Sequence, residues 1–76
     1  MYTIADYTTD KTITVEDKYE LEDKLNAMFD RDAFAYEDRE TGEDHTIGEV
    51  IDQLVEAINR GEYAGDYTAA LNIGIE

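Results

Sequence analysis

The stretch of sequence that decides the fold is residues 46–61, TIGEVIDQLVEAINRG. Thr46 and Glu49 have the spacing of a capping box, in which each side chain accepts a hydrogen bond from the other residue's backbone N–H. Gly61 follows Arg60 and suits the left-handed conformation that commonly ends a helix. The apolar residues between these ends follow a 3.6-residue period, which predicts an amphipathic helix with one buried face. They are Ile47, Val50, Ile51, Leu54, Val55 and Ile58.

A second helix is predicted to begin near Asp17. Asp17 and Glu20 have capping-box spacing with Asp in place of Ser or Thr, and Thr14 with Asp17 offers an alternative register. The spacing of the apolar residues predicts one stripe over about three turns. These residues are Leu21, Leu25, Met28 and Phe29. The opposite, solvent-facing side is expected to carry Glu16, Glu20, Asp23 and Lys24.

The rest of the chain is richer in strand patterns. Residues 2–7 and 12–15 predict a hairpin, and residues 33–36 a short strand. The polar residues 37–45, centred on Gly42, fit either a loop or the tip of a hairpin. Apolar and polar residues alternate over 67–75, which predicts a final strand in the interior of the sheet. We therefore expect one α+β domain over residues 1–76. Its fold would be a two-layer sandwich of a 3–4-stranded, mainly antiparallel sheet on two helices, in the order β(β)αβαβ.

Composition excludes several classes of function. The 76 residues include 20 acids and 6 bases, and the net charge of −14 argues against direct binding to nucleic acid or an anionic membrane. The absence of cysteine excludes disulfides, a thiol nucleophile and zinc–thiolate sites. The start, MYTIADYTTD, has no basic segment and no long apolar run. We therefore expect no secretory signal and a cytoplasmic location.

No pattern in the sequence predicts catalysis or a cofactor. His45 is the only histidine, and no serine nucleophile motif or phosphate-binding glycine loop accompanies it. Asp38, Glu40 and Glu49 fall at positions 1, 3 and 12 of an EF-hand-like window, but Glu43 stands where that loop requires glycine. We expect a protein that is not an enzyme and has no catalytic residues, cofactor or built metal site.

The distribution of charge predicts a binding surface instead. Residues 16–44 hold twelve acids and four bases, and the total of −14 exceeds the magnitude of about 2–8 that keeps a small domain soluble. Closely set carboxylates imitate the phosphates of a nucleic acid, so the predicted partner is a basic nucleic-acid-binding protein. Tyr63 and Tyr67, close to the acids Glu62 and Asp66, are predicted to anchor that interface. The predicted partner-binding acids are Glu16, Glu20, Asp23, Asp30, Asp32, Glu37, Asp38, Glu40, Glu43 and Asp44.

In its size, acidity, lack of cysteine and tyrosine-plus-acid composition, the whole chain resembles small phage-encoded inhibitors of host defence. These are the anti-CRISPR and anti-restriction proteins that mimic DNA. The resemblance implies stoichiometric blocking of a defence nuclease or surveillance complex in the host cytoplasm. It includes no shared motif, so no residue role follows from it. Two alternatives fit the same composition: an immunity protein or antitoxin that masks a basic nuclease toxin, and an acidic halophile-type protein without mimicry. Monomer and homodimer both stay open.

We predict that the melting temperature rises with sodium chloride concentration, because salt screens repulsion among the acids. The Debye length falls from about 30 Å at 0.01 M salt to about 3 Å at 1 M. Each kcal/mol of repulsion removed raises the melting temperature of a domain this small by about 4–8 °C. Thermal unfolding followed by circular dichroism measures the change. Chloride is preferred to sulfate, which stabilises proteins by exclusion from their surface. A melting temperature that is the same at both concentrations would contradict the prediction.

Overall fold

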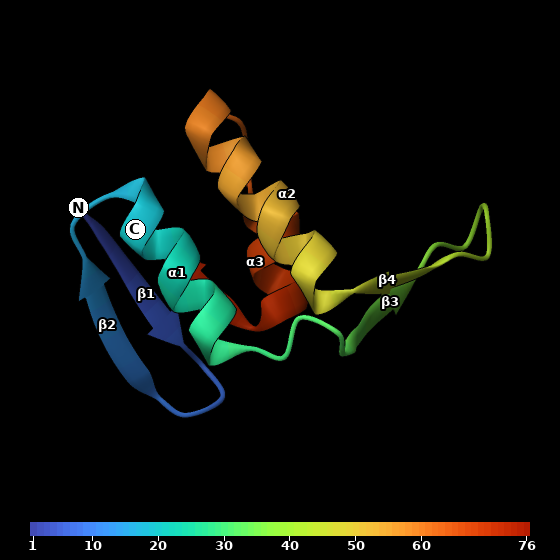
Figure 1. Ribbon diagram of the computed structural model, residues 1–76, viewed down its shortest axis with the longest axis horizontal. Helices are drawn as coiled ribbons and strands as arrows, with labels where there is room; N and C mark the ends of the chain where they lie inside the picture. The colour runs from blue at the N-terminus through green and yellow to red at the C-terminus, as the bar shows by residue number, and fades with distance from the viewer.

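The computed structural model describes residues 1–76 and confirms the α+β class. Figure 1 shows the main sheet at one end of the longest axis, the helices in the middle and a hairpin projecting at the other end. In chain order the elements are β1 (Tyr2–Asp6), β2 (Lys11–Val15), α1 (Lys18–Met28), β3 (Phe34–Glu37), β4 (Asp44–Thr46), α2 (Ile47–Arg60), α3 (Gly65–Leu71) and β5 (Ile73–Ile75).

The three-stranded sheet has the order β2-β1-β5, and both pairings are antiparallel. The predicted hairpin of β1 and β2 is confirmed, with Ile4 opposite Ile13. Ile4 also faces Ile75 of β5 and is fully buried. Thr3 and Glu76 exchange backbone hydrogen bonds of 2.9 and 3.0 Å, so the two ends of the described chain lie side by side.

Helix α2 supplies the largest share of the core, as its sequence predicts. Val50, Ile51, Leu54 and Val55 are buried. The capping box is present: the Glu49 N–H donates to the Thr46 hydroxyl at 3.3 Å, and the Thr46 N–H donates to the Glu49 carboxylate at 3.0 Å. Gly61 ends the helix at a φ of 70°, the left-handed conformation for which glycine is favoured. Both ends of α2 are therefore determined by local side-chain and backbone chemistry.

The prediction for α1 is also confirmed. Asp17 is its N-cap and accepts a hydrogen bond of 2.8 Å from the Glu20 N–H. Leu21 and Leu25 are fully buried against the core, with Met28 partly buried beside them. The opposite face is exposed and acidic, which matches the predicted amphipathic pattern.

The predicted final strand is wrong over residues 67–71, which belong to the third helix, α3. Tyr67 and Leu71 are four residues apart, so they lie on one face of a helix as readily as on one face of a strand. Asn72 ends α3 in the left-handed conformation, with a φ of 56°, and only Ile73–Ile75 remain as strand β5. The C-terminal segment is therefore a short helix followed by a short strand.

The predicted single sheet is also wrong in two respects. β5 lies at an edge and β1 takes the central position, because β1 pairs on both sides. β3 and β4 form a separate antiparallel pair, which settles the open choice for residues 37–45 in favour of a hairpin. No helix is both long enough and apolar enough to cross a membrane.

We predict that Leu54→Ala leaves the protein largely unfolded at room temperature. Leu54 is fully buried on α2, and removal of such a side chain costs about 2–5 kcal/mol. A core of this size supplies a net folding stability of only about 3–5 kcal/mol. Urea denaturation followed by far-ultraviolet circular dichroism measures the loss. The control is Gln53→Ala, the exposed neighbour, which should change stability by no more than about 0.5 kcal/mol.

Candidate functional site

The hairpin of β3 and β4 is the most prominent projection of the molecule (Figure 1). Its base packs against α2 and α3, and β4 continues directly into α2. The register places Phe34 opposite Thr46 and Tyr36 opposite His45, with an irregularity in β3 between Phe34 and Tyr36. Such a bulge bends the strand and re-aims its side chains. The result is a two-stranded arm that contacts the helices of the core at its base.

The tip of the arm is held by the backbone and carboxylate of Asp38. The Asp38 N–H donates to the Glu43 carbonyl at 2.8 Å, and the Gly42 N–H donates to the Asp38 carbonyl at 2.7 Å. The Asp38 carboxylate accepts the Glu40 N–H at 2.8 Å. Gly42 adopts a φ of 74°, which closes the turn in a conformation that favours glycine. Asp38 is thus half-buried and has a structural role at the tip.

Four acids at this tip have side chains that are exposed and form no hydrogen bond in the turn. They are Glu37, Glu40, Glu43 and Asp44. Glu37 and Asp44 face one another directly across the strand pair. Like charges in directly opposed cross-strand positions are destabilising. Arg39 is the only base between them in the chain. The tip therefore keeps a concentrated negative charge at a cost in folding stability.

The nearest base before the hairpin, Arg31, is already paired. Its guanidinium donates a hydrogen bond of 2.9 Å to the Asp52 carboxylate on α2, and also bonds to the Asn26 side chain. The hydrogen bond with Asp52, supported by the charges of Asp52, Glu22 and Asp32, raises the pKa of Arg31 above its ordinary value. Arg31 is engaged at the foot of the arm, so it leaves the acids of the tip unneutralised.

The predicted acids do not form one surface. Glu16 lies between β2 and α1, and Glu20 and Asp23 lie on α1, at the end of the molecule away from the hairpin tip (Figure 1). Glu20 accepts the Glu16 N–H at 3.2 Å, and Asp30 accepts the Asp32 N–H at 3.0 Å, so these two carboxylates have local structural roles. The acids of the tip form the denser group.

Two exposed aromatic residues of the arm were not predicted as site residues. The side chain of Phe34 is 65% exposed and that of Tyr36 is 40% exposed. Tyr36 stacks on the His45 ring, with ring centroids 4.7 Å apart and an interplanar angle of 22°. His45 in turn lies 3.0 Å from the Glu49 carboxylate. Aromatic side chains at the surface are typical of protein interfaces. The signal in the sequence was the FAYE segment itself, which carries two aromatic residues. In the structure this segment is a strand that pairs only with β4.

A hollow of about 320 Å³ lies at the base of the arm, where β3 meets α2 and α3. Its lining is largely apolar and consists of Tyr36, Val50, Asp66, Tyr67 and Ala70. The predicted anchor Tyr67 therefore lies close to the hairpin. The acidic tip, the exposed aromatics and this hollow all belong to the arm or to its base, and together we call them the arm surface. It comprises residues 34–45 and the five residues lining the hollow.

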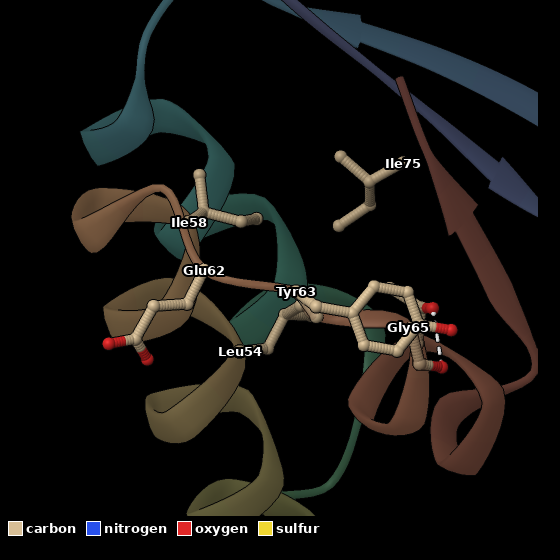
Figure 2. A pocket seen from close by; sticks show the side chains of 8 residues that line it. Leu54, Ile58, Glu62, Tyr63, Gly65 and Ile75 are labelled. Carbon is tan, nitrogen blue, oxygen red and sulfur yellow. Dashed lines mark hydrogen bonds between the residues drawn. The ribbon is translucent and has the colours of Figure 1, made fainter.

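The other predicted anchor, Tyr63, lies elsewhere. It is 82% exposed and lines a second hollow of about 350 Å³ between α2, α3 and β5 (Figure 2). Figure 2 shows its ring beside Gly65, where it occupies the space that a Cβ at residue 65 would take. Tyr63 and Tyr67 thus belong to two different surface hollows.

No group of three or more histidine, aspartate or glutamate side chains is arranged to hold a metal ion. Glu49, which was position 12 of the EF-hand-like window, serves the capping box of α2. Comparison with known proteins finds no matching family model, no matching curated sequence and no matching solved structure. The arm surface must therefore be interpreted from its own chemistry.

We predict that Glu37→Lys stabilises the protein, because it replaces a repulsive cross-strand pair with an attractive one opposite Asp44. The expected gain is about 0.2–1 kcal/mol, measured by urea denaturation. Glu62→Lys makes the same change of net charge at an exposed position outside the arm, and it controls for the general relief of repulsion. In an Asp44→Asn background the advantage of Glu37→Lys over Glu62→Lys should shrink. An equal gain from both lysines in the wild-type background would contradict the prediction.

Proposed function

We propose that this protein is a non-enzymatic inhibitor of the DNA-mimic type, which occupies the basic nucleic-acid-binding surface of a defence nuclease or surveillance complex. It would act stoichiometrically in the cytoplasm of the host cell. The observation that carries the proposal is the exposed acid cluster on a projecting arm, in which Glu37 faces Asp44 despite their like charge. A charge arrangement that lowers folding stability and forms no structural hydrogen bond is accounted for by a binding role.

The form of the arm also supports the proposal. A partner that accommodates a nucleic acid presents a basic groove, and a narrow two-stranded arm can enter a groove that excludes a whole domain. The acids at the tip would attract that groove at long range and raise the association rate. The exposed Phe34 and Tyr36 behind the tip would then supply apolar contact area. The charge and the shape of the arm thus both support it as the element that binds the partner.

The test is capture of proteins from a host lysate by the immobilised protein at low salt, followed by competition with duplex DNA. We expect the captured protein to bind nucleic acid, to form a complex of fixed stoichiometry, and to be displaced by DNA or by salt. Glu40→Lys with Glu43→Lys should weaken binding about tenfold or more, equivalent to about 1.4 kcal/mol. Neither side chain holds the turn together, so the arm should stay folded.

The matched control is Glu16→Lys with Asp23→Lys, which changes the net charge by the same amount at the other end of the molecule. This control should bind nearly as well as the wild type. Equal weakening by the two double variants would indicate that only bulk charge matters, and it would overturn the assignment to the arm. A captured protein that has no affinity for nucleic acid would overturn the proposed function itself.

A further inference from the structure

The hollow at the base of the arm has a lining suited to one kind of side chain. Tyr36 and Tyr67 contribute two aromatic rings, Val50 and Ala70 contribute apolar groups, and Asp66 contributes one carboxylate. An arginine side chain can use all three, since its methylene stem packs on apolar surface while its planar guanidinium stacks on aromatic rings and pairs with a carboxylate. The volume of about 320 Å³ is near the lower limit for ligand pockets, which favours a single side chain.

The one charged side chain that lines the hollow, Asp66, is complementary to a cation. The ion pairs of the chain are Arg31 with Asp52, His45 with Glu49 and Arg60 with Glu56, so Asp66 keeps an unpaired carboxylate. No lysine or arginine is among the residues that line the hollow. One face of the Tyr36 ring is covered by the stacked imidazole of His45, so a guanidinium would have to stack on the other face.

We propose that this hollow is the specificity pocket of the arm surface and receives one arginine side chain of the partner. In it the guanidinium would stack on Tyr36 or Tyr67 and pair with Asp66. The inference deepens the proposed function and rests on it for the identity of the partner's surface. Nucleic-acid-binding surfaces are rich in arginine, which contacts phosphates in two-pronged fashion. The acidic tip would supply attraction, and the pocket would select the position of one arginine.

The pocket can be tested without the natural partner, using the blocked tripeptide acetyl-Gly-Arg-Gly-amide as the probe. Titration followed by two-dimensional NMR of the labelled protein should give saturable shift changes at the amides of the residues that line the hollow. The same tripeptide with citrulline, which has the shape of arginine without its charge, should bind at least about threefold more weakly. The lysine tripeptide should also bind more weakly, because an ammonium cannot stack as a plane.

Two substitutions locate the binding groups. Asp66→Asn should weaken arginine binding about two- to fivefold, the range of an exposed ion pair. Tyr36→Leu keeps an apolar wall and should weaken it by a similar factor through loss of the cation–π contact. Asp23→Asn on α1 makes the same chemical change as Asp66→Asn outside the hollow, and it should leave binding unchanged.

Equal weakening by Asp66→Asn and Asp23→Asn, or equal binding of the arginine and citrulline peptides, would overturn the pocket. These outcomes are separable from the test of function. If the tripeptide fails to bind but Glu40→Lys with Glu43→Lys abolishes partner capture, the inhibitor proposal stands and the arginine pocket falls. If the tripeptide binds in the hollow but capture is insensitive to the tip acids, the pocket stands and the inhibitor proposal falls.

Discussion

The rest of the structure depends on burial of one face of α2. This helix contacts α1, α3, β3 and β4, and its side chains occupy the centre of the core. Its first turn also positions the arm. Thr46 is both the last residue of β4 and the N-cap of α2, and the N–H groups of Ile47 and Gly48 donate to the carbonyls of Ala33 and Arg31 at 2.8 and 3.0 Å. Donors that a helix leaves unpaired at its start therefore bind the chain that leads into β3.

This arrangement explains how a small core tolerates so much negative charge. A domain of 76 residues without disulfides has only a few kcal/mol of stability to lose. Acids at the tip of an arm face solvent on most sides, where water and salt reduce their repulsion. The same acids on the three-stranded sheet would repel one another within the packed body of the domain. With these acids on the arm, their mutual repulsion acts away from the packed core.

Local chemistry determined which parts of the fold were predictable. The capping residues and the apolar period of α2 are compatible with only one structure, a helix. Those of α1 are almost as clear. Residues 67–71 were mispredicted because Tyr67 and Leu71 satisfy both a helical and a strand period, and the left-handed Asn72 gives only a weak signal in sequence. The acids of the tip were predictable from their density in the chain. Their separation from Glu16 and Asp23 was not, because it depends on how the hairpin docks on α2.

Charge by itself would make the arm attractive to any basic surface, so selectivity requires a second element of recognition. Electrostatic attraction in physiological salt extends about 8 Å and orients an approaching partner without fixing its register. A pocket that accepts one side chain fixes the register, but only if its distance from the charges is constant. The bonds that join β4 and the β3 entry to the first turn of α2 attach the base of the arm to the helix that carries Val50 of the hollow. Under the proposed function, a partner would have to match both the acids and the hollow, and a surface that matches only one would gain little.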